Sequence, residues 1–372
     1  DIRNIYCSTI FGYLICCLSL WGNNSKPSNI EPSDSLVILE NLPSGETVGT
    51  FTATDPDAGA SLSFSLLDGN ATFSIDSSGI LKTKGSLDYE SAHQHTIRVK
   101  VRDEHNASTE KVFTVTVLDM DEGQAPSSGS GTSQDPYHIE TLAHLKWLSY
   151  APSKHSKQFV LTNDINASET SSWANGYGFK PIGSGTRNFS GSFDGRGHAI
   201  SGLYINRPNS NAIGFFGRMQ RAEIFNLHLT NASVTGHNTV GLLVGNQANS
   251  TIENCSVSGS VTGRKTVGGL VGFSAVGSKI IKSKSGGNVQ GINDRIGGLV
   301  GHNYTSSQIT DCYSSAAVHG LHKWSGGFVG INTAKASITR SYAMGPSNQK
   351  GFAGSSHNGG MISDSFWDKE SS

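Results

Sequence analysis

The sequence is poor in charge and has no basic stripe. Only 15% of its 372 residues are charged, and the formal net charge is −1. A protein that neutralises nucleic-acid phosphates concentrates lysine and arginine along one face or segment, and this chain does not. We therefore do not expect nucleic acid as a partner.

The common catalytic signatures are also missing. The chain has no His-Glu-x-x-His, Gly-x-Ser-x-Gly, P-loop or Cys-x-x-Cys motif. Of its 13 histidines, His319 and His322 are close in sequence but have no evident third metal ligand. Asp194, Arg196 and His198 lie in Phe-Asp-Gly-Arg-Gly-His, but Asp-Gly and Arg-Gly are turn sequences. The sequence therefore predicts no catalytic residues.

Long apolar segments are scarce, and residues 5–21 form the exception. Arg3 precedes this run, and the polar residues from Asn23 to Lys26 follow it. A short apolar run with these flanks predicts an export signal over 1–22. A membrane anchor or a buried strand is the alternative. Residues 23–35, rich in Ser, Asn and Pro, are expected to be a linker.

The chain is rich in glycine, with 45 residues, and much of it belongs to a repeated phrase in 211–372. The phrase reads Val-Gly-Gly-Leu-Val-Gly at 267–272 and Ile-Gly-Gly-Leu-Val-Gly at 296–301. Its copies follow one another every 24 to 29 residues. A fixed period of this length marks stacked supersecondary units. The closing glycines of the copies are Gly217, Gly245, Gly272, Gly301, Gly330 and Gly354.

A second element follows each copy of the phrase. An isoleucine recurs, and the second residue after it is Asn or Asp in four of six copies, types that tolerate a left-handed bend. Three short strands per coil, with Gly and Asn/Asp at the corners, predict a right-handed parallel β-helix. The six corner residues are Asn226, Asn254, Lys282, Asp311, Arg340 and Asp364.

Cysteine is rare, with five residues, of which three lie in the predicted signal. Cys255 and Cys312 occupy equivalent positions two coils apart, with Ser283 between them. Two coils are separated by about 2 × 4.8 Å, which is too far for a disulfide. We expect two free, buried thiols.

The region before the repeats contains strand signals alternating with turns, for example at Thr96–Val101 and Val112–Val117. About seven short strands predict a β-sandwich over 36–122. A Gly, Ser, Pro and Gln-rich linker at 123–135 follows it. The β-helix cap and first coils are then expected at 136–210. Within them, Glu140–Tyr150 is the expected N-terminal cap helix, with Thr141 as its N-cap.

The acids of the sandwich gather in pairs at strand ends. Calcium prefers such hard oxygen ligands, although solvated turn acids would look the same. The ordered acidic set resembles a cadherin repeat over about 34–126. The resemblance implies two calcium half-sites. The expected ligands are Glu40, Asp88, Glu90, Asp119 and Asp121 at the C-terminal end, and Asp55, Asp57 and Asp103 facing a preceding domain.

The repeated Gly-Gly-Leu-Val-Gly phrase resembles the GLUG repeat of bacterial surface proteins. The lead-in Phe-Ser-Gly-Ser-Phe-Asp-Gly-Arg-Gly-His at 189–198 and the closing Ser-Phe-Trp-Asp at 365–368 fit the same pattern. This resemblance covers about 129–372 and implies an exported surface or adhesin-type protein, part of a longer chain, with no reaction attached.

An outward column beside the corner ends in three aromatic residues, Tyr313, Tyr342 and Phe366. Exposed aromatic faces on successive coils could bind sugar rings, stabilise the solenoid, or contact a missing neighbour.

The sequence as a whole predicts an all-β, exported, calcium-binding adhesin or extracellular scaffold whose partners are cell-surface proteins or glycans. Contact with a membrane is expected only through residues 1–22. The alternatives are a carbohydrate-active β-helix enzyme, meaning a polysaccharide lyase or glycosidase, and a passive stalk for a missing domain.

Overall fold

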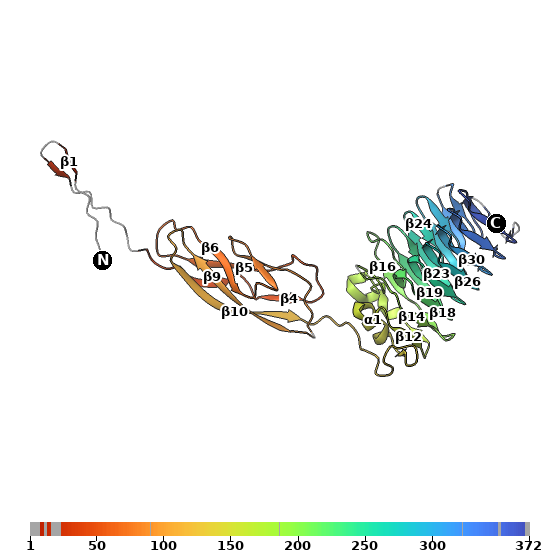
Figure 1. Ribbon diagram of the computed structural model, residues 1–372, viewed down its shortest axis with the longest axis horizontal. Helices are drawn as coiled ribbons and strands as arrows, with labels where there is room; N and C mark the ends of the chain where they lie inside the picture. The colour runs from red at the N-terminus through yellow and green to blue at the C-terminus, as the bar shows by residue number, and fades with distance from the viewer. Residues whose placement is uncertain are drawn as a thin grey trace. The chain divides into compact units, whose positions relative to one another are not determined.

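The structure is a computed structural model of the chain. It describes residues 24–89, 91–185, 187–321, 323–348 and 351–368, and the backbone alone of 8–10 and 13–15. The chain divides into two compact units, Asp1–Asp121 and Glu122–Ser372 (Figure 1).

The first unit is a β-sandwich of two four-stranded sheets. One sheet has the order β4-β10-β9-β6 and the other β3-β5-β8-β7. Only β4 and β10 pair in parallel. The strands are β3 (Ser28–Pro32), β4 (Val37–Leu39), β5 (Thr47–Thr54), β6 (Ser63–Asp68), β7 (Phe73–Ile75), β8 (Ile80–Thr83), β9 (Gln94–Arg102) and β10 (Ser108–Leu118).

Alternation along the strands creates the sandwich core. In β9, Ile97, Val99 and Val101 are buried, while the residues between them face outward. They pack with Phe51 and Phe73 from the other sheet. The β-sandwich that was predicted from short strand signals alternating with turns is confirmed.

The predicted linker over 23–35 is wrong at its centre. Strand β3 lies there and pairs antiparallel with β5. Only Ile30 of its five residues is buried, so the apolar pattern is too thin to show in the sequence. The ladder with β5 makes this segment a strand.

The predicted export signal, 1–22, lies mostly outside the described residues. Within it the structure describes β1 (Ser8–Ile10) and β2 (Tyr13–Ile15), which pair antiparallel. Among the described residues, no helix is long and apolar enough to span a membrane.

The second unit is a parallel β-solenoid. Its strands stack coil upon coil into four sheets, and the registers in all of them are parallel. The isoleucine sheet contains β11 (Tyr137–Ile139), β12 (Gln158–Leu161), β14 (Ser192–Asp194), β18 (Glu223–Phe225), β22 (Thr251–Glu253), β26 (Lys279–Ile281), β30 (Gln308–Thr310), β35 (Ser337–Thr339) and β38 (Met361–Ser363).

The aromatic-column sheet follows the corner in each coil. Its strands are β13 (Ile165–Asn166), β15 (Ala199–Ser201), β16 (Tyr204–Asn206), β19 (His228–Thr235), β23 (Ser256–Gly263), β27 (Lys284–Gly291), β31 (Tyr313–Ser314), β32 (Ala317–Gly320), β36 (Tyr342–Ala343) and β39 (Phe366–Trp367).

The glycine phrase carries two strands per coil, where the sequence predicted one. One glycine sheet contains β20 (Val240–Gly241), β24 (Thr266–Gly268), β28 (Arg295–Gly297) and β33 (Ser325–Gly326). The other contains β17 (Phe216–Gln220), β21 (Val244–Ala248), β25 (Val271–Ala275), β29 (Val300–Asn303), β34 (Val329–Asn332) and β37 (Ala353–Ser356).

The bend between these two strands explains the glycines. A Cβ on Gly268 would lie 2.1 Å from the carbonyl oxygen of Val271 and 2.6 Å from the amide nitrogen of Gly301. No side chain fits there. The prediction of three strands per coil is therefore wrong, because the bend at the glycines divides the phrase into two strands.

The corner prediction is confirmed at all six positions. Each corner residue has a φ between +46° and +56°. The five isoleucines of the second element from Ile224 to Ile338 are fully buried and stack in register. In the last described coil, Ile362 is 36% exposed.

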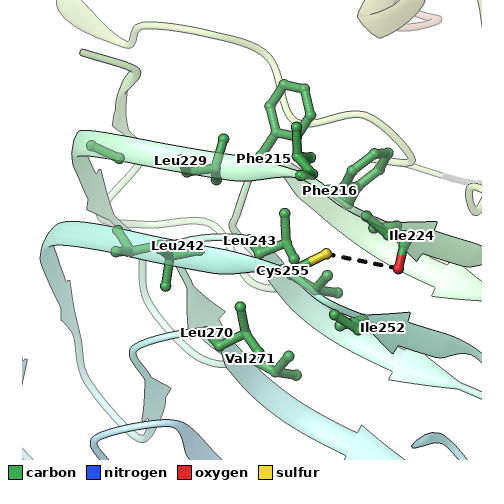
Figure 2. Close-up of a cluster of buried hydrophobic side chains, with 14 of the residues drawn as sticks. Phe215, Phe216, Ile224, Leu229, Leu242, Leu243, Ile252, Cys255, Leu270 and Val271 are labelled. Atoms are coloured by element: carbon green, nitrogen blue, oxygen red, sulfur yellow. Dashed lines mark hydrogen bonds between the residues drawn. The ribbon is translucent and has the colours of Figure 1, made fainter. Parts of the chain in front are cut away.

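The core of the solenoid changes along its length. Its first coils are filled by aromatic rings, including Phe189, Phe193, Phe215 and Phe216. The middle coils use aliphatic residues such as Leu270 and small ones such as Cys255 (Figure 2), and an aromatic pair, Phe328 and Phe352, returns in the late coils.

The cap helix is confirmed, with slightly different bounds. Helix α1 (Leu142–Tyr150) begins after Thr141, whose hydroxyl accepts a hydrogen bond from the amide of His144 at 3.2 Å. Leu145 and Leu148 are buried in the solenoid core. Two short 3₁₀ helices, η1 (Pro152–Lys154) and η2 (Ser168–Gly176), were not predicted.

Candidate functional site

Glu40 organises the C-terminal end of the sandwich. It is 0% exposed, and its two carboxylate oxygens accept backbone hydrogen bonds from Tyr89 at 2.7 Å and Met120 at 2.8 Å. These contacts join three predicted ligand segments, because Tyr89 follows Asp88 and Met120 follows Asp119. The carboxylate thus ties this end of the domain together.

Three of the other predicted ligands at this end lie at the surface. Asp88 accepts a hydrogen bond from the hydroxyl of Ser91 at 2.8 Å. Asp88, Asp119 and Asp121 are exposed, and Glu90 lies outside the described residues.

The N-terminal end brings Asp55, Asp57 and Asp103 together through the neighbouring residues Asn24 and Ser25. The side-chain amide of Asn24 donates to Asp103 Oδ2 at 3.0 Å, and the backbone amide of Ser25 donates to Asp57 Oδ2 at 2.7 Å. The backbone amide of Asp57 in turn donates to Asp55 Oδ1 at 2.8 Å.

Asp103 is buried, whereas Asp55 is half-buried with one buried carboxylate oxygen. Asp103 is 4% exposed, and its Oδ1 accepts hydrogen bonds from the amides of His105 and Ala107 at 2.8 and 2.9 Å. Asp55 Oδ2 is buried and has no hydrogen-bond partner among the described residues. A buried carboxylate oxygen without a partner is unfavourable, and a cation at that position would satisfy it.

The acids do not form a closed metal cage. Within the described part of the chain, no group of three or more His, Cys, Asp or Glu side chains is arranged to hold a metal ion. Calcium takes six to eight oxygen ligands, so the trio would need small side-chain shifts and further oxygens to bind it. The unpartnered oxygen of Asp55 is the observation that fits such an ion.

The predicted aromatic column exists on the outer face of the solenoid. The rings of Tyr313 and Tyr342 stack with centroids 5.1 Å apart and planes 8° apart. Tyr342 pairs in register with Phe366, which is 71% exposed. On the coil before Tyr313, Lys284 places its ammonium group 5.8 Å from the centre of the Tyr313 ring.

A second aromatic group was missed. Phe273 stacks with Tyr304 at 5.9 Å, and His302 contacts both rings. Burial, with Arg295 and His357 as lesser causes, lowers the pKa of His302 to about 4, and its Nε2 lies 3.0 Å from the hydroxyl of Thr333. Register between β25 and β29 pairs Phe273 with His302, a signal that was present in the repeat spacing.

The residues that resembled an active site have structural partners. Asp194 Oδ1 accepts hydrogen bonds from the backbone amide of Arg196 at 2.9 Å and the side-chain amide of Asn226 at 3.1 Å. His198 pairs with Asp164 at 3.1 Å, and hydrogen bonds from Ala199 and His198 lower the pKa of Asp164. His319 is described, whereas His322 lies outside the described residues.

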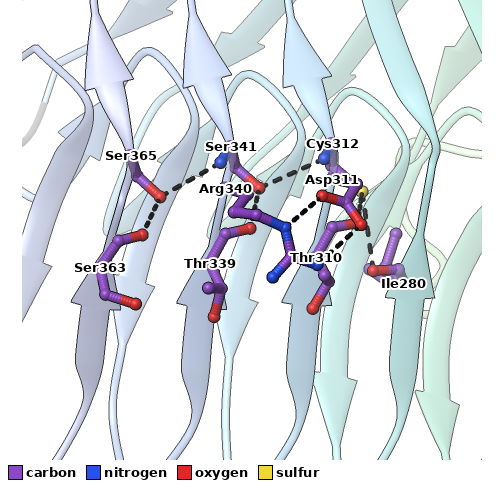
Figure 3. A network of polar contacts seen from close by, with 9 residues as sticks. All are labelled: Ile280, Thr310, Asp311, Cys312, Thr339, Arg340, Ser341, Ser363 and Ser365. Carbon is purple, nitrogen blue, oxygen red and sulfur yellow. Dashed lines mark hydrogen bonds and ion pairs between the residues drawn. The ribbon is translucent and has the colours of Figure 1, made fainter.

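The expected thiols are free and buried. Burial raises the pKa of both Cys255 and Cys312 to about 12. Each thiol occupies the position after the corner residue, where Ser283, Ser341 and Ser365 stand in other coils, and makes the same kind of contact with the carbonyl two residues before it. Ser341, for example, donates to Thr339 O at 3.0 Å and accepts from the amide of Cys312 at 3.2 Å (Figure 3).

Comparison with known families identifies both units. Residues 34–118 match the cadherin domain, and residues 236–262 and 293–318 match the GLUG motif. The chain is therefore an all-β protein with a cadherin domain followed by a GLUG-repeat solenoid.

Similar proteins include two from prokaryotes. Halomucin of Haloquadratum walsbyi is 33% identical over 240 residues, covering 62% of this chain and 2% of halomucin. A putative Gly-rich membrane protein of Evansella cellulosilytica is 36% identical over 155 residues, covering 39% of this chain and 18% of that protein. The chain thus spans a small fraction of the length of either curated relative.

Among solved structures, a putative immunoglobulin A1 protease from Bacteroides ovatus aligns with 61% of this chain and 70% of that chain. The sequence identity is 23% and the TM-score is 0.49.

Proposed function

We propose that this chain is an exported cell-surface protein of adhesion type whose cadherin domain binds calcium at its N-terminal end. The domain composition supports the proposal, as do relatives whose names describe a mucin and a membrane protein. Its partners are cell-surface proteins or glycans.

The unpartnered, buried Oδ2 of Asp55 carries the calcium proposal. It lies in the same turn as Asp57, and the adjacent residues Asn24 and Ser25 connect that turn to the buried Asp103. A carboxylate oxygen that is buried without a hydrogen-bond donor is stabilised by a nearby positive charge. Calcium would supply that charge and hold the segment before β3 against the sandwich.

The C-terminal acidic set has a separate proposed role. Glu40, Asp88, Glu90, Asp119 and Asp121 are the ligands implied by the cadherin resemblance. Because both oxygens of Glu40 accept backbone amides, calcium at this end would share a carboxylate that already has a structural role.

The solenoid is proposed to be non-catalytic. The carboxylate of Asp194 is engaged by its own turn and by Asn226, which supports a structural role for the only sequence that resembled an active site. Incubation with neutral and acidic polysaccharides should release no reducing or unsaturated ends. Release that is lost in Asp194→Asn would instead establish the enzyme alternative.

Isothermal titration with calcium tests the binding proposal. Asp103→Asn keeps the oxygen that accepts the two backbone amides but removes the charge, so it should abolish or greatly weaken calcium binding. Asp68→Asn is the matched control, because Asp68 is an exposed acid of the same domain that pairs with Arg98. Equal calcium affinity in Asp103→Asn and wild type would refute the N-terminal site.

A further inference from the structure

A pocket in the first coils of the solenoid contains two arginines and no acidic residue. Its volume is about 570 Å³, and it is an open hollow on the surface, because all of its lining residues except the half-buried Asn188 are exposed. The lining residues are Pro152, Ser153, Ser156, Arg187, Asn188, Ser190, Gln220 and Arg221. We propose that this arginine pocket binds the anionic group of an acidic polysaccharide, either a uronate carboxylate or a sugar sulfate.

Backbone hydrogen bonds fix the segments around the pocket. The amides of Ser190 and Gly191 both donate to the carbonyl of His155 at 2.8 Å. The amide of Gln220, at the end of β17, donates to the carbonyl oxygen of Phe189 at 2.9 Å. The 3₁₀ helix η1, the loop 187–191 and the end of β17 are thereby held in one arrangement, which lowers the entropy lost on binding.

The charge of the pocket selects anions. Arg187 and Arg221 contribute two guanidinium groups, which bind carboxylate or sulfate oxygens in a bidentate manner. Lys154 and Lys157 belong to the same segment as the serines of the lining. Glu223 is close to Arg221 in sequence but is not part of the lining.

The remaining lining favours a sugar over an acidic peptide. Five of the eight lining residues are Ser, Asn or Gln, which donate to and accept from hydroxyl groups. Asn188 and Gln220 are already joined by a hydrogen bond of 2.9 Å, so their amides are oriented. Pro152 is the only apolar lining residue, so the pocket offers little to the side chains of a peptide.

This inference rests on the adhesion part of the proposed function, to which it gives a ligand class, and is independent of calcium. The test is titration of the full chain, in EDTA, with polygalacturonate and heparin oligosaccharides. Neutral dextran oligosaccharides, inorganic sulfate and poly-glutamate serve as comparison probes. Binding in EDTA separates this proposal from the calcium site.

We expect at least one acidic oligosaccharide to bind and dextran not to bind. Preference for polygalacturonate identifies a carboxylate ligand, whereas preference for heparin, which carries both carboxylates and sulfates, shows that sulfate groups contribute. Arg187→Gln and Arg221→Gln should each weaken binding about tenfold, because each removes a charged hydrogen-bond donor. Arg196→Gln, at an exposed turn outside the pocket, is the matched control and should bind like wild type.

A second variant, Ser153→Glu, adds a negative charge to the exposed lining and leaves both arginines unchanged. This variant should also bind the acidic oligosaccharide more weakly than wild type. Unchanged melting temperatures would show that all variants are folded. The proposal is overturned if no acidic oligosaccharide binds, if poly-glutamate or sulfate binds as well as the sugars, or if the two arginine variants bind like wild type.

Discussion

The sandwich and the solenoid differ in the kind of polar side chain that they bury. Among the described residues, both buried acids, Glu40 and Asp103, are in the sandwich. The solenoid buries uncharged side chains that repeat from coil to coil. Gln247, Ser274, Asn303 and Asn332 occupy one such column. Hydrogen bonds of 3.0 and 2.9 Å join its successive pairs Gln247–Ser274 and Asn303–Asn332.

The difference follows from architecture. A solenoid side chain has an equivalent neighbour about 4.8 Å away on the next coil, so an amide or hydroxyl gains a partner by repetition. The repetition does not satisfy every atom, because Gln247 Oε1 and Asn303 Oδ1 have no partner among the described residues. An acid stacked on an identical acid would be repelled. The sandwich has no such repeat, and each buried acid needs a specific set of donors or a cation. Function that depends on buried charge is therefore expected in the sandwich, whereas the charged groups of the solenoid, such as Arg187 and Arg221, lie at its surface.

The largest expected effect is loss of an aromatic ring from the first coils. Phe216→Ala should destabilise the solenoid by about 3–5 kcal/mol, because the buried ring packs against Phe189, Phe193 and Phe215. Differential scanning calorimetry should show a lower solenoid transition and an unchanged sandwich transition. Phe366→Ala, at an exposed position, should leave both transitions in place.

Acidification should weaken the solenoid through His302. Its pKa is lowered to about 4 in the folded state, whereas an unfolded histidine has a pKa of about 6.5. Between these values the unfolded chain binds more protons, so stability falls as the pH drops from about 6.5 to 4. The loss is at most about 3 kcal/mol.

Urea unfolding at pH 7 and pH 4.5 checks this. Burial lowers the pKa of other solenoid histidines, such as His155, so part of the pH dependence will remain in any single variant. His302→Gln should therefore show a smaller loss on acidification than wild type. If the variant and wild type lost the same free energy of unfolding on acidification, His302 would not be the group responsible for the pH dependence.

Glu40→Gln separates a structural acid from a ligand. The substitution keeps one acceptor but sets an amide NH₂ group against either Tyr89 N–H or Met120 N–H, so the sandwich should lose about 1–3 kcal/mol. We expect this loss both in calcium and in EDTA, measured by chemical unfolding. A loss seen only in calcium would make Glu40 primarily a calcium ligand.

The smallest effect is expected at the exposed corner pair of the solenoid. Arg340 contacts both carboxylate oxygens of Asp311, at 2.7 and 2.9 Å, and the hydrogen bond and charge of Arg340 lower the pKa of Asp311 (Figure 3). Such exposed pairs contribute little to stability, because solvent and salt screen the two charges. Arg340→Ala should shift the solenoid transition only slightly, and less at high salt. A shift as large as that of Phe216→Ala would show that this exposed pair is not a weak surface contact.

Repetition also explains what the sequence could predict. The corner residues and the isoleucine column were predictable because six copies of one pattern reinforce each other. The extra strand in the glycine phrase was not, because the phrase does not show that a backbone bends at Gly268 rather than continuing. Strand β3 was missed because only one of its residues, Ile30, is buried, and a single apolar position does not give the alternation that predicts a strand.

The candidate site shows the same limit. The sequence grouped the acids into two ends, and the contacts of Asn24 and Ser25 connect the N-terminal trio. Whether a carboxylate oxygen has a hydrogen-bond donor depends on which residues surround it in the folded chain. Glu40 meets two backbone amides, whereas Asp55 Oδ2 meets none, and neither fact can be read from the spacing of acidic residues.

The most direct test is calorimetric unfolding of the chain in calcium and in EDTA. Saturating calcium at about 100 times its Kd stabilises a folded domain by about 2.7 kcal/mol, which for a domain of this size raises its melting temperature by about 10 °C or more. The account predicts that shift for the sandwich transition alone, with the solenoid transition unmoved and the shift lost in Asp103→Asn. A sandwich transition at the same temperature in both conditions would contradict it.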